Sequence, residues 1–473
     1  MNYELVSGFE THVELATATK IFCGCSTKFG ASPNTHCCPV CTGQPGALPV
    51  LNKKVVEFAI RAGLATHCKI NTTTRLDRKN YCYPDLPKAY QISQFDKPLC
   101  EHGYVELESG KKIRLTRIHI EEDAGKLVHE RGYTFIDYNR GGVPLIEIVS
   151  EPDISSPEEA REYVEKLQLI MRYIGVSDCK MQEGSMRCDV NISLRPKGSK
   201  ELGTRTEIKN MNSVSFIEKA MAYEAGRQAE ILSSGGKIEQ ATLRFDENTG
   251  ETYVMRTKED AQDYRYFPEP DLLTVKIPQQ KVEEIASALP ELPLEKFRRY
   301  TDVLGISVQN ARLLYRYKAV CDFFDRCVLL GAGAKNTSNL ILGTIYSTLS
   351  TEEEKEAFDI RVSAEDMAEL VRYVDGGKIN ITLAQMTLSK MLKVGGKVSD
   401  YISEADLAGI SEGELEELCR EAVAANPKAA EDYKSGKLKA IGGLFGYIKR
   451  ATQGKADIKK AEEIIIRLLG NDK

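Results

Sequence analysis

The sequence predicts an α+β protein with a mainly antiparallel sheet, followed by a region made only of helices. Over the first ~290 residues, stretches that alternate apolar and polar residues are interleaved with stretches of helical period. The segment "LPELPLEK", residues 289–296, is typical of a linker, and amphipathic helical patterns dominate beyond it. We therefore expect domains at residues 1–292, 293–408 and 409–473.

Alternation in "GFETHVEL" and "SMRCDVNISLR" predicts two strands with distinct faces. The core-facing residues are Phe9, Thr11, Val13, Leu15, Met186, Cys188, Val190, Ile192 and Leu194. The opposite faces consist of Glu10, His12, Glu14, Arg187, Asp189, Asn191 and Ser193. A third stretch, "RTEIK", places Arg205, Glu207 and Lys209 on one face.

Two capped helices are predicted between and after these strands. The first begins at Ser156, where "SPEE" is a capping box with Pro157 at the first helical position, and it ends at Gly175. The second begins near Ser215 and stops at the glycines 235 and 236.

The composition is that of a globular chain, with 42% hydrophobic and 28% charged residues among 473. A net charge of −5 means that any contact with nucleic acid has to come from local patches. We find neither the basic and apolar regions of a signal peptide nor an apolar run of the ~18 residues that a membrane span needs. We expect a cytoplasmic protein with no membrane partner and reduced cysteines.

Five cysteines lie between positions 23 and 41. Cys23 and Cys25 form one close pair, and Cys38-Pro-Val-Cys41 forms a second with the spacing that lets both thiolates turn toward one ion. This pattern predicts a structural zinc site that stabilises a polar loop. Cys37 is left out, His36 is a less favoured substitute ligand, and the alternative is a set of reduced thiols without metal.

Several carboxylates need an explanation. Glu147 lies inside the apolar run "GGVPLIEIVSEPD", so a cation or a metal should lie beside it. With Glu10, His12 and the "EED" stretch from Glu121, it predicts a Mg²⁺ site built from separate strands. The alternative is solvated faces and buried Arg pairs, and the pattern does not choose between Glu121 and Glu122.

Basic and aromatic residues alternate in "LDRKNYCYPDLPKAYQISQFD". Arg78, Lys79 and Lys88 with Tyr81 and its neighbouring tyrosines suit contact with phosphate and with a base or ribose, and equally suit a rigid Tyr-Pro loop. Neither a P-loop nor a dinucleotide-binding fingerprint is present.

Longer motifs give a specific resemblance. They are "GFETHVEL", "KIFCGCSTKFGASPNTHCCPVCTGQPGALPVLN", "DRKNYCYPDLPKAYQISQFD", "HIEEDAGK", "YNRGGVPLIEIVSEPD", "EGSMRCDVNISLR", "TRTEIKNMNS" and "DYRYFPEPDL". In this order they resemble the B-subunit family of the aspartyl/glutamyl-tRNA amidotransferases, densely over the first ~270 residues. The resemblance implies a cradle-shaped catalytic domain related to glutamine synthetase, then a helical domain and a small helical tail.

The resemblance also implies an activity. A protein of this family would use ATP and Mg²⁺ to phosphorylate the side-chain carboxylate of Glu-tRNA(Gln) or Asp-tRNA(Asn), and ammonia would displace the phosphate. An amidase-type A subunit would supply the ammonia, and a small C subunit would complete a heterotrimer. The sequence does not decide which tRNA is the cellular substrate.

Site residues follow from the matched motifs. The resemblance implies that Glu10, His12, Glu122 and Glu147 bind Mg²⁺ and take part in catalysis. It implies that Glu207 is a further catalytic residue, and that Arg78, Lys79 and Tyr81 contact the nucleotide or the substrate.

The tail carries a local basic patch. From residue 428 to 460 it has nine Lys or Arg against three Asp or Glu, with interspersed glycines, which suits the sugar-phosphate surface of folded tRNA. An ordinary solvated basic face is the alternative. For the whole chain, the alternatives to the enzyme are a non-catalytic tRNA-binding scaffold and a zinc-ribbon RNA-binding module.

Overall fold

The computed structural model describes residues 3–257, 263–403, 407, 411–452 and 456–470. The chain divides into two compact units, Met1–Pro293 and Leu294–Lys473. The predicted three-domain division stays a prediction, and its boundary between residues 408 and 409 lies outside the described residues.

The first unit is built on a nine-stranded sheet in the order β14-β13-β12-β11-β1-β10-β7-β6-β2. The strands are β1 (Tyr3–Glu14), β2 (Lys69–Ile70), β6 (Cys100–Glu106), β7 (Lys112–Glu122), β10 (Pro144–Ser150), β11 (Met186–Pro196), β12 (Thr206–Met211), β13 (Ala241–Asp246) and β14 (Glu251–Thr257). Among the described pairings of this sheet only β12 with β13 is parallel. The expected antiparallel-rich sheet is therefore confirmed, whereas a relation to glutamine synthetase stays a prediction.

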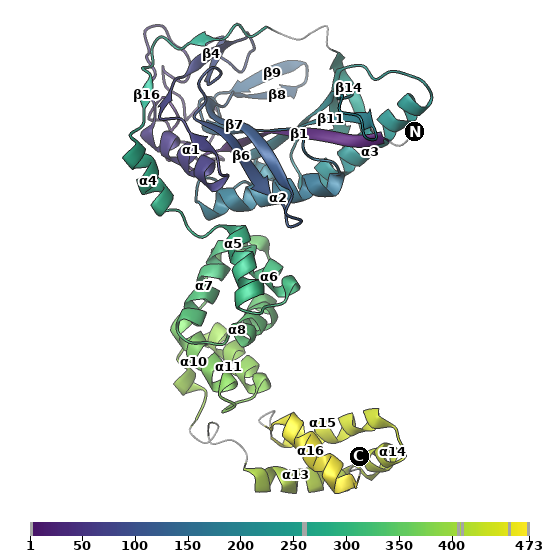
Figure 1. The fold of residues 1–473 in the computed structure, drawn as a ribbon. Helices are drawn as coiled ribbons and strands as arrows, with labels where there is room; N and C mark the ends of the chain where they lie inside the picture. Colours follow the sequence, from purple (N-terminus) through teal and green to yellow (C-terminus); the bar gives the residue numbers. More distant parts are fainter. Residues whose placement is uncertain (1–2, 258–262, 404–406, 408–410, 453–455, 471–473) are drawn as a thin grey trace. The chain divides into compact units, whose positions relative to one another are not determined.

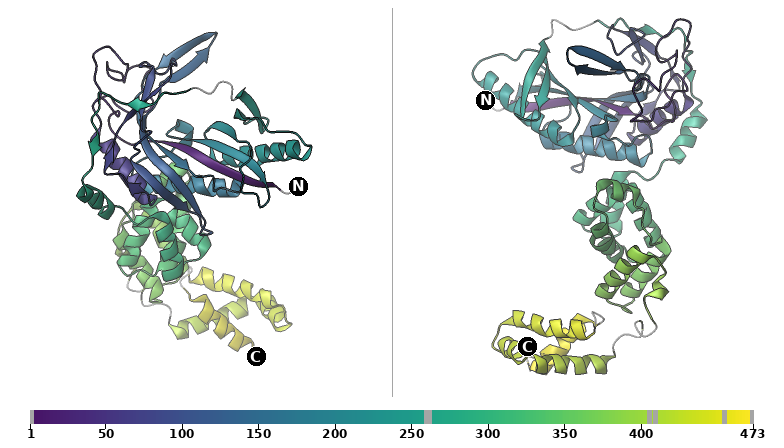
Figure 2. Two further views of the ribbon diagram at one scale, coloured as in Figure 1. Left: turned by 45° about the horizontal axis from the view of Figure 1, so that its top comes forward. Right: turned by 180° about the vertical axis from the view of Figure 1, so that it is seen from behind.

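Three helices cover one face of this sheet, as Figures 1 and 2 show. They are α1 (Lys53–Ala65), α2 (Pro157–Tyr173) and α3 (Val214–Ser233). Phe9, Thr11 and Val13 of β1 are buried on the helix side, where the Phe9 ring lies 5.6 Å from that of Tyr163 in α2. The alternation predicted for β1 and β11 is thus confirmed, and the even-numbered residues of β1 face the other side.

Both predicted helices form, with one difference in capping. Ser156 caps α2 by accepting from Glu159 N, and Pro157 is its first residue. The carboxylate of Glu159 does not complete a capping box, because it accepts instead from Ser155 N and from Lys111 Nζ. The second helix, α3, begins one residue before the predicted position.

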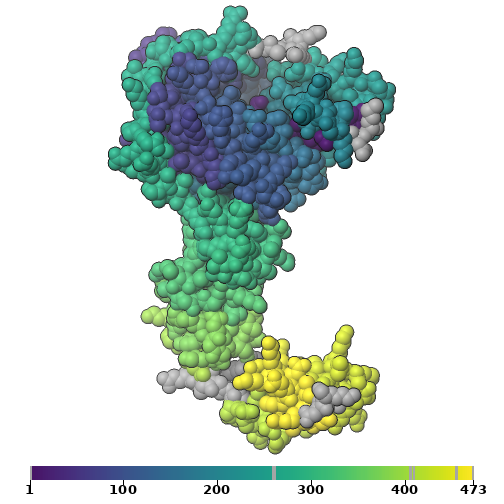
Figure 3. All heavy atoms as spheres, viewed as in Figure 1, coloured from purple at the N-terminus to yellow at the C-terminus, as the bar shows by residue number. Residues whose placement is uncertain are grey.

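Smaller sheets and one further helix complete the first unit. β4 (Asp77–Asn80) lies between β5 (Tyr90–Ser93) and β15 (Phe267–Pro268). β3 (Thr73–Thr74) pairs with β16 (Val275–Lys276), and β8 (Lys126–Glu130) pairs with β9 (Tyr133–Asp137). α4 (Gln279–Ser287) packs against α1. Because β16 pairs with β3 and α4 packs against α1, green-teal and violet segments lie side by side on the surface in Figure 3.

In the described residues of the second unit every regular element is helical, as expected. The α-helices are α5 (Pro293–Arg298), α6 (Val308–Tyr315), α7 (Lys318–Leu329), α8 (Ala334–Leu340), α9 (Glu352–Ala357), α10 (Ala364–Asp375), α11 (Ile381–Val394), α13 (Glu412–Ala425), α14 (Pro427–Lys434), α15 (Ile441–Ala451) and α16 (Ile458–Leu469). The last four share a hydrophobic core of their own. None of the helices in the described ranges is long and apolar enough to cross a membrane.

Candidate functional site

The candidate site lies on the sheet face opposite the helices. In the strand register His12 of β1 stands opposite Glu147 of β10, and Glu147 stands opposite His119 of β7. Since directly paired residues of neighbouring strands point to the same face, these side chains form a row across three strands. On the other side of β1, His12 stands opposite Arg187 of β11.

Two carboxylates and a histidine converge at the centre of this row. His12 Nε2 lies 3.4 Å from Glu121 Oε1 and 3.6 Å from Glu147 Oε2. The three residues offer ligand atoms within 4.8 Å of one another, and we call them the His12 cluster. His119 lies behind it, with Nε2 3.4 Å from Glu147 Oε2 and 3.7 Å from Glu121 Oε2.

Neighbouring charges shift the pKa values of these buried groups. Burial acts to lower the pKa of His12, but the hydrogen bond to Glu121 and the charge of Glu147 outweigh it and raise this pKa to about 9. Burial acts to raise the pKa of Glu147, yet the charge of His119 dominates and lowers it to about 2. Glu147 therefore has two imidazoles beside it, those of His12 and His119.

A second group of carboxylates lies beside the His12 cluster. Glu10 of β1, Asp189 of β11 and Glu207 of β12 offer oxygens within 4.8 Å of one another, and we call them the Glu10 cluster. Lys209 Nζ lies 2.9 Å from both Asp189 Oδ2 and Glu207 Oε1. Burial and the nearby charge of Glu147 raise the pKa of Glu10. Glu10 and His12 are alternate residues on one face of β1, so the two clusters lie side by side on the sheet.

Glu122 lies outside both clusters, which differs from its predicted placement among the metal ligands. Its Oε1 accepts from Ile92 N at 2.9 Å and forms an ion pair with Lys88 Nζ. Successive residues of a strand point to opposite faces, so only Glu121 can join His12. Sequence reasoning placed Asp189 on the face away from the core without giving it a role in the site, and it missed His119.

Lys79 of β4 lies beside the His12 cluster and has no ion pair of its own in the described residues. Its Nζ lies 5.0 Å from the ring centre of Tyr264 and 5.9 Å from that of Tyr81. Burial acts to lower the pKa of Lys79, but the charge of Glu121 outweighs it and raises this pKa. Tyr264 in turn contacts Tyr266, with ring centres 6.1 Å apart. The structure thus brings the predicted Lys79 and Tyr81 together beside the cluster.

Arg78 does not join them. Its guanidinium donates to both oxygens of Glu269, at 2.7 Å and 2.9 Å, and lies 4.1 Å from the ring centre of Tyr90. These contacts hold β4 against the segment around β15, and contact of Arg78 with a nucleotide stays a prediction.

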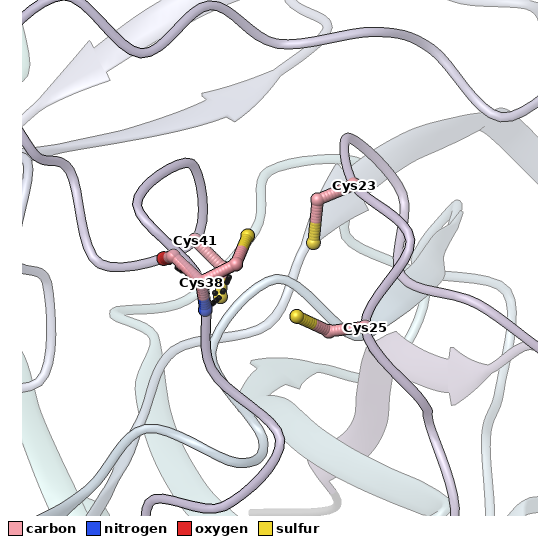
Figure 4. Close-up of side chains that lie close together, drawn as sticks. All are labelled: Cys23, Cys25, Cys38 and Cys41. Atoms are coloured by element: carbon pink, nitrogen blue, oxygen red, sulfur yellow. Dashed lines mark hydrogen bonds between the residues drawn. The ribbon is translucent and has the colours of Figure 1, made fainter.

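The four predicted zinc ligands converge from two segments of the loop between β1 and α1. Figure 4 shows Cys23 and Cys25 facing Cys38 and Cys41, with the sulfurs of all four pointing inward. Their Sγ atoms lie within 4.8 Å of one another, and Cys38 Sγ is 3.9 Å from Cys41 Sγ. Tetrahedral zinc with Zn–S bonds of about 2.3 Å separates sulfurs by about 3.8 Å, so the geometry fits zinc.

Hydrogen bonds and burial shift the thiols of the cysteine cluster in opposite directions. The hydrogen bond between Cys23 and Cys41 raises the pKa of Cys23 and lowers that of Cys41 to about 4, and burial raises the pKa of Cys25. The amide of Cys38 also donates to Cys41 Sγ at 3.2 Å. Cys37 points elsewhere, with Sγ 3.9 Å from Asn139 Oδ1. His36 likewise lies outside the cluster.

Comparison with known proteins agrees with this arrangement. Residues 5–283 match the family model described as "GatB/GatE catalytic domain", and residues 322–469 match "GatB domain". Proteins named as the B subunit of aspartyl/glutamyl-tRNA(Asn/Gln) amidotransferase are similar over 98% of this chain. They include those of Thermoanaerobacter sp. (51% identical, 99% of its length), Caldicellulosiruptor saccharolyticus (50%, 98%) and Bacillus licheniformis (48%, 99%). The chain therefore belongs to the B-subunit family of the aspartyl/glutamyl-tRNA amidotransferases.

Proposed function

We propose that this chain activates the side-chain carboxylate of Glu-tRNA(Gln), Asp-tRNA(Asn) or both by ATP-dependent phosphorylation. The observation that supports this most is the adjacency of the His12 and Glu10 clusters on one sheet face. A carboxylate becomes a good acyl donor only once an oxygen is converted to a leaving group, and bringing ATP to it requires cations that screen the charges.

Both clusters offer ligands to Mg²⁺, which would bind the neutral form of His12 in one and would displace Lys209 from Asp189 and Glu207 in the other. Carboxylate oxygens are the ligands that Mg²⁺ prefers, and three protein ligands leave positions for water and phosphate. Mg²⁺ bound there would neutralise negative charge on the phosphate oxygens during transfer. Glu121 takes the place in the His12 cluster that was expected for Glu122. Glu207, expected as a further catalytic residue, joins Glu10 in the second cluster.

Lys79 is proposed to bind the transferred phosphate. Its ammonium is held by the rings of Tyr81 and Tyr264 and has no carboxylate partner among the described residues, so it is able to accept an anion. The same tyrosines offer faces for stacking with a base or ribose. Arg78 is not proposed for this role, because Glu269 occupies its guanidinium.

The partners follow from the names of the relatives. Those proteins are named as one subunit of an aspartyl/glutamyl-tRNA(Asn/Gln) amidotransferase, which implies a complex. For this chain we propose that an amidase-type A subunit supplies ammonia and that a small C subunit completes a heterotrimer. The basic α14–α16 region is proposed to bind the tRNA body. The four-cysteine cluster is proposed to hold a structural zinc ion, since a closed set of four thiolates leaves no position for substrate.

The test is replacement of Glu147 with Gln in the assembled complex. Phosphoryl transfer from ATP to Glu-tRNA should fall by at least ~100-fold, while tRNA affinity stays within about twofold. Persistence of phosphoryl transfer with intact tRNA binding would leave the chain as a non-catalytic scaffold. Ile148→Val, on the same strand but on the helix side of the sheet, serves as the control for a local change in β10.

A further inference from the structure

Lys20 is a fully buried lysine, with 0% of its surface exposed. Its ammonium donates to the main-chain oxygen of Tyr138 at 3.1 Å. Throughout the described ranges, no carboxylate forms an ion pair with Lys20 Nζ. A buried ammonium that has only a neutral acceptor is costly, and such a group is retained where an anion compensates it.

The four-cysteine cluster is a source of such an anion. Lys20 N donates to Cys25 O at 2.9 Å, which ties the lysine to one pair of ligands. Its side chain runs toward the other pair: a Cβ placed on Gly142 would lie 3.6 Å from Lys20 Cδ and 3.6 Å from Cys41 Cβ. The aliphatic part of Lys20 and the ligand Cys41 therefore flank the same glycine.

One carboxylate lies in the same region. Glu122 Oε2 would be 3.9 Å from the Cβ placed on Gly142. The charge of Glu122, however, is already balanced by its ion pair with Lys88. On the other side of Gly142 lies Cys41, which can supply a second negative charge to this region as a thiolate.

We propose that Lys20 is the counter-ion of the metal centre formed by Cys23, Cys25, Cys38 and Cys41. The inference rests on the proposed zinc site. One Zn²⁺ and four thiolates carry a net charge of about −2, and groups around such a centre determine its affinity through charge and hydrogen bonds. A permanent positive charge at Lys20 reduces this net charge without becoming a ligand.

The stabilisation by Lys20 depends on the negative charge of the centre. With zinc and four thiolates in place, Lys20 balances part of that charge, and loss of one ligand thiolate makes the charge smaller. Replacing Lys20 by an apolar residue of similar length should therefore destabilise the zinc-loaded protein more than a variant that has lost a ligand.

Zinc affinity is the first measurement. Lys20→Met should bind zinc at least about tenfold more weakly than the wild type in competition with a chromogenic chelator. Lys166→Met is the matched control, because Lys166 is a buried lysine of α2 that pairs with Glu162 and lies outside the cysteine cluster. Cys37→Ser should retain zinc. Unchanged affinity in Lys20→Met would overturn the role of Lys20.

Thermal unfolding in a zinc-free background is the second measurement. Cys38→Ser removes one ligand, and adding Lys20→Met to it should lower the unfolding temperature of the first unit by less than Lys20→Met lowers it in the wild type. Equal shifts in both backgrounds would overturn the inference. Native mass measurement separates the two proposals. A wild-type protein without zinc overturns the zinc site and this inference together, whereas bound zinc with unchanged affinity in Lys20→Met overturns only the latter.

Discussion

Glu121 and Glu122 are neighbours in β7, yet their carboxylates lie in different surroundings. Glu121 Oε1 is 3.4 Å from His12 Nε2, whereas Glu122 Oε1 accepts from Ile92 N at 2.9 Å and pairs with Lys88. One carboxylate is available to a metal shared with β1 and β10, and the other fastens β7 to β5 and the segment before it.

This difference predicts opposite outcomes for two similar substitutions. Glu121→Gln should weaken Mn²⁺ or Mg²⁺ binding at the His12 cluster by about 10–100-fold, because it removes a charged ligand. Glu122→Gln should change the same affinity by less than about threefold. Titration calorimetry with Mn²⁺ measures both, and equal losses in the two variants would contradict the assignment.

The alternation of β1 and β11 was enough to place Glu10 and His12 on the face away from the core, because the buried residues around them form an unbroken apolar set. The same reasoning could not choose between Glu121 and Glu122. That choice depends on where β7 ends and on which strand pairs with it, and both are set by contacts between β7 and β10 that are distant in sequence. The sequence could not predict the pairing of Arg78 with Glu269 for a similar reason, because the two residues are 191 positions apart.

Lys79 provides the second prediction. Lys79→Met should lower the rate of phosphoryl transfer from ATP by about 100-fold or more, because the site loses the cation that faces the His12 cluster. Lys97→Met, which removes an exposed lysine of the same unit, is the control. Single-turnover transfer of labelled γ-phosphate measures the rate. A Lys79→Met protein as active as Lys97→Met would exclude Lys79 from the reaction.

Asp153 provides a prediction about pH. Arg114 donates to both of its oxygens, at 2.8 Å and 2.7 Å, and these hydrogen bonds lower the pKa of Asp153. A carboxyl with a lowered pKa stabilises the folded state above the pKa of the unfolded chain, about 3.9, and loses this contribution as the pH falls through the folded-state pKa.

Asp153→Asn should therefore be less stable than the wild type at pH 7, and the difference should shrink as the pH is lowered below about 4. Urea midpoints for the first unit, measured from pH 7 down to pH 3, give the two curves. Arg114→Met should flatten the acid dependence in the same way. Parallel curves for wild type and Asp153→Asn would show that this ion pair contributes nothing to the pH dependence.

The helical region α13–α16 provides the last prediction. Its hydrophobic core is formed within its own four helices, so charges on its surface can be changed without disturbing the sheet of the first unit. Lys449 and Arg450 are exposed in the last turn of α15. If this surface follows the tRNA backbone, each cation that contacts a phosphate releases counterions and adds about one unit to the salt dependence of binding.

The double variant Lys449→Glu, Arg450→Glu should therefore bind tRNA more weakly, and the slope of log affinity against log salt should fall by about two. ATP hydrolysis without tRNA should stay unchanged, because the His12 cluster belongs to the other unit. Lys390→Glu with Lys393→Glu, two exposed lysines of α11, is the charge-matched control. If the two double variants lose affinity equally, the effect reflects overall charge rather than a tRNA-binding surface on α15, because both change the net charge by the same amount.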